Sequence, residues 1–216
     1  MFDFKIKRLD KVKFNIDELV EYYYTLERDF QHLKWKPWMI INPDQLEVAN
    51  WYVGGNCNEL DWGGWCIQKT QDNTTDEIEC PWRVGKSPSA SENASVTNRS
   101  AVAFGIVEKF LDTFPDVAQM ALVIHPPGAH LVMHSDNSPE DIDNQVIQVP
   151  ILTNDRAYWI DRDGIKTVLQ PGYAYLVDTW YDHGTINEGN TPRIHIKFSV
   201  SKKHVEWLIN TGFDIT

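Results

Sequence analysis

The second half of the chain consists of short apolar segments separated by turn residues, and this pattern constrains the fold more than any other feature. After Pro115 the segments follow one another with no helical periodicity between them. Many short strands at such spacing are typical of an antiparallel sandwich or barrel. The eight candidate strands are 119–125, 129–134, 145–152, 157–160, 166–169, 173–177, 183–186 and 193–200.

Helices are expected on either side of these strands. Residues 15–33 carry apolar side chains at helical spacing, and Asn15 is a candidate N-cap. Asp17 and Glu18 follow it and complement the positive end of the helix dipole. Residues 100–113 and 203–209 have the same kind of apolar face. The fold class that we predict is therefore mainly β with flanking helices.

The length of the chain favours a single domain. One compact unit suits 216 residues better than two, because all-β folds often reach this size. We expect one domain over 1–216. Within it we expect helical and irregular support in 1–115, a β core in 116–201 and a C-terminal helix or tail in 202–216.

The stretch 35–98 differs in composition from the rest of the chain. Six of the nine tryptophans lie between Trp35 and Trp82, among glycine, asparagine and serine residues. We interpret it as an irregular excursion with a few short strands, and loops of this length are often functional. Its aromatic side chains fit two roles, a lid over a substrate or an anchor that holds the loop to the core.

Charge and cysteine content exclude some partners and suggest a compartment. The net charge of −11 and the isoelectric point near 5.0 argue against nucleic acid and against anionic membrane surfaces. The three cysteines have no metal-type spacing, and the first residues lack the apolar core of a signal peptide. No segment approaches membrane-spanning length. We expect reduced thiols and a cytoplasmic protein.

The motif His134-Ser135-Asp136, followed by a distant His183, points to a metal site. Successive side chains alternate in an extended segment, so His134 and Asp136 point the same way. Two imidazoles and one carboxylate on one face of an octahedral metal are diagnostic of non-haem Fe(II) oxygenases. A short H-x-D motif is common by chance, and it is the ordered set with His183 that gives it weight.

Arg193 is a candidate anchor for a carboxylate. It follows His183 by ten residues, after a Gly189-Asn190 turn that would bring it back toward the metal site. From Arg193 the strand alternates sharply, with apolar side chains on one face and polar ones, including His195, on the other. A polar barrel interior and a solvated face both give this pattern. We interpret His125 and His195 as hydrogen-bonded interior residues rather than ligands.

The run from Ala121 to Val200 resembles the double-stranded β-helix, a jelly-roll of cupin-like form, of the 2-oxoglutarate/Fe(II) oxygenases. It is most similar to the aspartyl/asparaginyl β-hydroxylase branch. The matching elements are His134-x-Asp136, the segment 148–153, Pro171-Gly172 before 173–178, His183-x-x-x-Asn187 and Arg193.

The resemblance implies a cofactor and a set of roles. His134, Asp136 and His183 would bind Fe(II), and Arg193 would bind the distal carboxylate of 2-oxoglutarate, with O2 as the oxidant. One position departs from the pattern. The branch carries an Arg-x-His pair before the proline of its central strand, where this chain has Val146 and Gln148. Gln148 retains a hydrogen-bonding group for the cosubstrate, but the positive charge is lost.

We therefore expect a 2-oxoglutarate-dependent dioxygenase that hydroxylates an amino-acid-like, peptide or small-metabolite substrate. Trp180 and Tyr181, just before His183, are candidates for the substrate wall. Two alternatives stay open: a cupin-like metal hydrolase or isomerase using the same ligands, and a non-catalytic β-sandwich binding module. The sequence does not specify the oligomeric state.

Overall fold

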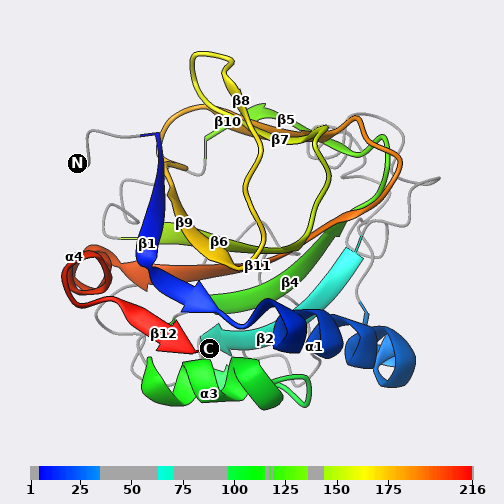
Figure 1. Ribbon diagram of the computed structural model, residues 1–216, viewed down its shortest axis with the longest axis vertical. Coiled ribbons are helices and arrows are strands. Elements are labelled where there is room, and N and C mark those ends of the chain that lie inside the picture. Colours follow the sequence, from blue (N-terminus) through cyan, green and yellow to red (C-terminus); the bar gives the residue numbers. More distant parts are fainter. Residues whose placement is uncertain are drawn as a thin grey trace.

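Two stacked sheets form the centre of the molecule, and helices cover the outer face of the larger one (Figure 1). The computed structural model describes residues 5–34, 63–70, 97–114, 117, 119–135 and 144–215. In order across the sheet, the larger sheet contains β12 (Phe213–Ile215), β1 (Ile6–Phe14), β9 (Tyr173–Val177), β6 (Asn144–Leu152), β11 (Arg193–Ser201), β4 (Gln119–His125), β2 (Gly63–Thr70) and β3 (Thr97–Arg99). The smaller sheet contains β5 (His130–His134), β10 (His183–Asn187), β7 (Ala157–Ile160) and β8 (Lys166–Thr167).

The chain passes back and forth between the two sheets. From β4 to β11 it alternates between the larger and the smaller sheet, with β7 and β8 paired as a hairpin on the smaller one. Neighbouring strands are antiparallel throughout this region. This winding is the double-stranded β-helix, so the predicted fold class is confirmed. All eight predicted strands are present, and their bounds differ from the prediction by at most a few residues.

The N-terminal part contributes strands as well as helices. Strand β1 pairs with β9 and with β12, and β2 pairs with β4, so the larger sheet extends beyond the expected core of 116–201. Strand β1 was not predicted from the sequence, because only Leu9, Val12 and Phe14 of its side chains are buried and the charged residues between them hide the pattern. The segments 35–62 and 71–96, which make up most of the stretch expected to be irregular, lie outside the described residues.

The first predicted helix is confirmed, with a shorter extent. Helix α1 spans Ile16–Asp29, and the Oδ1 of Asn15 accepts hydrogen bonds from the backbone N–H groups of Asp17 and Glu18. The chain leaves the helical conformation at Phe30 and continues in the 3-10 helix η1 (Gln31–Leu33).

The second predicted helix begins later than expected. Helix α3 spans Gly105–Thr113, whereas periodicity alone placed its start at Ser100. Ser100 instead closes a turn, in which its carbonyl accepts from the N–H of Ala103 at 3.0 Å. Gly105 has a φ of +62°, a left-handed conformation that interrupts a helix running through it. The third predicted helix is confirmed as α4, which spans Lys202–Thr211. Within the described residues no helix is long and apolar enough to cross a bilayer.

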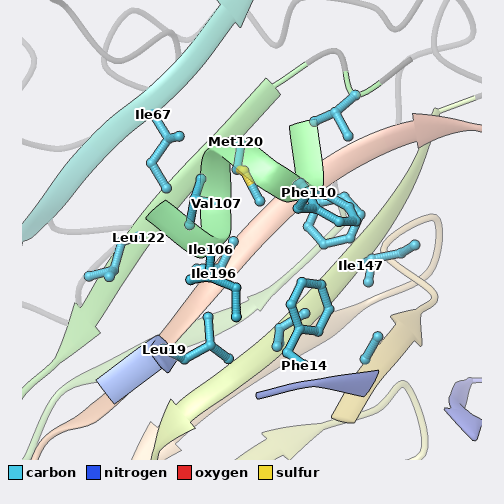
Figure 2. Packing of buried hydrophobic residues seen from close by; sticks show 14 of the residues in the cluster. Phe14, Leu19, Ile67, Ile106, Val107, Phe110, Met120, Leu122, Ile147 and Ile196 are labelled. Carbon is cyan, nitrogen blue, oxygen red and sulfur yellow. The ribbon is translucent and has the colours of Figure 1, made fainter. Parts of the chain in front are cut away.

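The main apolar core lies between the larger sheet and the helices (Figure 2). Side chains of α1 and α3 pack there against the apolar faces of β4, β6 and β11, and Phe110 lies at the centre. Its ring centroid is 5.3 Å from that of Phe14, 5.8 Å from that of Phe114 and 5.1 Å from that of Phe198. This aromatic contact ties helix α3 to strands β1 and β11.

The opposite face of β11 points between the two sheets. Arg193, His195 and Ser199 are buried there, while Ile194, Ile196 and Phe198 belong to the apolar core. Both faces of this strand are thus buried. The polar half of its alternation marks a polar barrel interior and not a solvated face.

Replacing Phe110 should destabilise the fold strongly. We expect Phe110→Ala to lower the free energy of unfolding by about 3–5 kcal/mol, because the substitution leaves a cavity among three rings. Urea unfolding followed by circular dichroism measures this. The matched control is Tyr24→Ala on α1, whose side chain is exposed and should change the free energy by no more than about 0.5 kcal/mol. Equal losses for both variants would contradict this account of the core.

Candidate active site

Two histidines lie side by side at one end of the smaller sheet. His134 on β5 is the direct register partner of His183 on β10, and their ring centroids are 4.4 Å apart. Both side chains are buried, with 5% and 3% of their surface exposed. The strands approach closely here because the next residue is Gly184, where a Cβ would lie 2.8 Å from the carbonyl oxygen of Leu131. Residues separated by 49 positions are thereby brought into contact.

The His183 ring is held in a defined orientation. Its Nδ1 lies 3.0 Å from the carbonyl oxygen of Tyr181, which can only accept, so Nδ1 carries the proton. The lone pair is then on Nε2, as a metal-ligating imidazole requires. The indole of Trp159 on β7 stacks on the ring, with centroids 4.8 Å apart and planes 7° from parallel. These two contacts fix the tautomer and the plane of the ring.

The third predicted ligand, Asp136, lies outside the described residues. Among those described, no group of three histidine, cysteine, aspartate or glutamate side chains is close enough to hold a metal ion. The two imidazoles themselves suit a borderline metal such as Fe(II), Zn(II) or Mn(II). Asp136 follows His134 by two residues, so its position in sequence suits a carboxylate ligand to the same ion.

Arg193 lies inside the barrel at the start of β11 with 1% of its surface exposed. Its Nη2 donates to the Oε1 of Gln148 on β6 at 2.7 Å. Its Nη1 is buried, and among the described residues it has no hydrogen-bond partner. The sequence proposed both Arg193 and Gln148 as cosubstrate-binding residues. The structure places their side chains in contact.

The charge of Arg193 is not compensated within the described part of the chain. Burial lowers the pKa of its guanidinium from 12.5 to about 10, and no carboxylate among the described residues acts in the opposite direction. The group stays protonated at neutral pH. Burying the charged guanidinium therefore costs about 3 kcal/mol relative to its exposure to water in the unfolded chain. A buried cation normally has an anionic partner. This site therefore has the properties of an anion-binding site.

A second layer of polar residues lies beside Arg193. His125 on β4 is the register partner of Arg193, and its Nδ1 is 3.2 Å from the Oγ1 of Thr185 on β10. This contact joins the two sheets across the barrel. His195 packs edge-on against His125, with ring centroids 5.4 Å apart. Burial, with Arg193 next in importance, holds the pKa values of both imidazoles well below 6.5, so both are neutral.

The sequence-based prediction for these two histidines holds in part. Both are interior residues, and His125 is hydrogen-bonded as expected. The Nδ1 of His195, however, is buried without a hydrogen-bond partner among the described residues.

The candidate wall residues Trp180 and Tyr181 lie in the turn that leads into β10. Both are half-buried, and the carboxylate of Asp178 accepts from the backbone N–H of Trp180 at 3.1 Å. Burial raises the pKa of Asp178. The guanidinium of Arg162 lies 4.0 Å from the centroid of the Tyr181 ring. The backbone of Tyr181 contacts the His183 ring, and the role of both aromatic residues toward a substrate stays a prediction.

Sequence reasoning missed Trp159 and Thr185 as site residues. The pattern of 157–160 is an ordinary strand, and nothing local distinguishes Trp159 from a core tryptophan. Its place follows from the pairing of β7 with β10, in which Trp159 is opposite Thr185 and diagonal to His183. Pairing between segments so far apart in sequence is not readable from either segment alone.

Several solved structures share part of the fold. A prolyl-4-hydroxylase of Pseudomonas putida is 9% identical, with 92% of this chain and 93% of that chain covered and a TM-score of 0.49. A cupin domain of Bordetella pertussis is 18% identical, with coverage of 38% and 79% and a TM-score of 0.32. A predicted oxalate decarboxylase of Thermotoga maritima is 17% identical, with coverage of 42% and 73% and a TM-score of 0.33.

Comparison at the level of sequence gives a family. No curated protein sequence matches the chain significantly. The family model described as aspartyl/asparaginyl beta-hydroxylase matches residues 13–203. This range includes the candidate ligands His134 and His183, together with Gln148 and Arg193. This match confirms the sequence-based prediction of a hydroxylating oxygenase. The chain belongs to the aspartyl/asparaginyl beta-hydroxylase family.

Proposed function

We propose that the protein is an Fe(II)- and 2-oxoglutarate-dependent hydroxylase. His134, His183 and Asp136 would hold the iron, and Arg193 would bind the distal carboxylate of the cosubstrate. The observation that carries the proposal is the buried guanidinium of Arg193, which has no carboxylate partner among the described residues and lies in the same barrel as the two adjacent imidazoles. A dicarboxylate that also chelates a metal satisfies both features at once.

The protein's part in the reaction is binding, orientation and exclusion of water. Iron held by these residues would supply the oxidation together with 2-oxoglutarate and O2. One oxygen atom would enter the substrate, and the other would enter the succinate that forms as 2-oxoglutarate loses CO2. Arg193, steadied by Gln148, would orient the cosubstrate through a charge-assisted hydrogen bond. Trp159 covers one face of the His183 ring and excludes water from it. Fixed ligands and a dry site are what the fold provides for such a cofactor.

The substrate that we propose is an amino-acid-like compound, a peptide or a small metabolite. Trp180 and Tyr181 precede His183 in sequence and would form part of the wall that the substrate contacts. The Arg162 guanidinium over the Tyr181 ring adds a cation at this end of the site. A panel of amino acids and short peptides, scored by turnover, would identify the class.

Uncoupled turnover tests the proposal directly. Purified protein with Fe(II), 2-oxoglutarate and ascorbate should release succinate slowly without added substrate. Titration with 2-oxoglutarate separates this activity from a cupin-like hydrolase or isomerase, which has no reason to bind the 2-oxo acid. Absence of both succinate and 2-oxoglutarate binding in metal-loaded protein would overturn the proposal.

Loss of one imidazole should abolish metal binding. We expect His134→Ala to lose stoichiometric binding of Mn(II), used as an air-stable substitute for Fe(II), because a ligand is removed. Isothermal titration calorimetry measures it. The matched control is His130→Ala on the same strand, at the register position opposite Ile186, which should bind Mn(II) as wild type does. Wild-type affinity in His134→Ala would show that the ligand assignment is wrong.

Removing the guanidinium of Arg193 should weaken ligand binding without lowering the stability of the ligand-free protein. We expect Arg193→Met to weaken 2-oxoglutarate binding to the Mn(II)-loaded protein by about 100-fold or more, because charge-assisted hydrogen bonds are lost. Without ligand, the variant should unfold at the same temperature as wild type or a higher one, because an uncompensated buried charge has been removed. Calorimetric titration and thermal unfolding give the two values.

The control for this experiment is Arg156→Met, which removes an arginine whose side chain is 62% exposed. It should change neither 2-oxoglutarate affinity nor the unfolding temperature appreciably. A large fall in the unfolding temperature of ligand-free Arg193→Met would mean that the guanidinium is already compensated within the protein.

A further inference from the structure

Three buried side-chain nitrogens in the described part of the chain have no hydrogen-bond partner. They are Nε1 of Trp159, Nη1 of Arg193 and Nδ1 of His195. All three belong to strands that enclose the barrel interior, two of them to β11 and one to β7. A buried polar group without a partner destabilises the folded state, because its hydrogen bond to water has been lost and not replaced. Two of the three, on Arg193 and His195, belong to the polar face of β11, which indicates a ligand there that accepts hydrogen bonds.

Arg193 and His195 are neighbours on one face of β11. They are two residues apart in a strand, so their side chains point to the same side. Both are buried, with exposed fractions of 1% and 2%. The charge of Arg193 also contributes to the lowered pKa of His195, as expected for groups that lie close together. The two unpartnered atoms are thus available to one acceptor group.

The neighbouring strands do not satisfy His195. Its register partner on β4 is Val123, and its register partner on β6 is Pro150. Neither side chain can donate or accept a hydrogen bond. His125 beside it is different, because its Nδ1 is in contact with the hydroxyl of Thr185. Of the two neutral imidazoles in this layer, only that of His195 has an Nδ1 without a hydrogen-bond partner among the described residues.

We propose that His195 is a further cosubstrate-binding residue, in which Nδ1–H donates a hydrogen bond to the carboxylate that Arg193 anchors. A carboxylate has two oxygens, so it can accept from Nη1 of Arg193 and from Nδ1 of His195 together. The pair would make the site selective for a 2-oxo acid that has a second carboxylate. This inference rests on the proposed function, because it assigns a second contact to the same cosubstrate.

Selectivity between two 2-oxo acids tests the assignment. 2-Oxopentanoate has the carbon chain of 2-oxoglutarate without the distal carboxylate, so it cannot use the proposed bond. With Mn(II)-loaded protein in a calorimeter, we expect His195→Leu to bind 2-oxoglutarate about 10- to 100-fold more weakly than wild type. Its affinity for 2-oxopentanoate should be unchanged, which also shows that the variant is folded.

Two conservative variants keep the test decisive if His195→Leu does not fold. The amide nitrogen of His195→Asn can stand where Nδ1 stands, and it should restore most of the preference for 2-oxoglutarate. The longer His195→Gln places its amide near Nε2 and should not restore it. The matched imidazole control is His130→Leu, outside this layer at the register position opposite Ile186, which should leave the ratio of the two affinities as in wild type.

The possible outcomes separate the two proposals. If wild type binds no 2-oxoglutarate, the proposed function fails and this inference fails with it. If wild type binds it and His195→Leu keeps the wild-type ratio of affinities, only the inference is overturned. An equal weakening of both ligands in His195→Leu also overturns it, because such a change does not depend on the distal carboxylate.

Discussion

Strand β11 is buried on both faces, and the two faces have opposite chemistry. Ile194, Ile196 and Phe198 pack into the core beneath the helices, while Arg193 and His195 point between the sheets. A strand in this position cannot slip by one residue, because a slip would exchange every side chain between the two faces and bury the guanidinium among apolar groups. The apolar half therefore fixes the register that places the polar half, and the site depends on it.

Without a bound ligand, the polar interior of the barrel lowers the free energy of unfolding. Burial of the Arg193 charge and of unpartnered nitrogens opposes folding, and the large apolar core on the other face of the sheet compensates for it. An anionic ligand would remove much of this cost on binding, which makes ligand affinity and stability two measures of one arrangement. On the central strand β6, Gln148 accepts a hydrogen bond from Arg193 and holds the guanidinium in place. We infer that the second contact to a carboxylate comes from β11 itself, through His195.

Much of the fold was predictable because its signals are local. The strands 119–125, 157–160 and 173–177 have the predicted bounds, since alternation and turn residues define each segment by itself. The Asn15 cap was equally local. Strand β1 was missed because most of its side chains are charged, and its partners β9 and β12 lie more than 150 residues away. The start of α3 was misplaced because periodicity extends past a glycine whose left-handed conformation is not visible in sequence.

The sequence by itself determined the order of the chemical groups His134, Gln148, His183 and Arg193, all of which lie within the segment that the hydroxylase family model matches. It also determined the alternation of β11, which follows from the twofold repeat of an extended chain. Only the tertiary structure decided whether the polar face of β11 lies in solvent or inside the barrel, because that depends on the smaller sheet packing over it. The stacking of Trp159 on His183 and the unpartnered nitrogen of His195 were decided in the same way, since each depends on strands that are distant in sequence and meet only when the barrel closes.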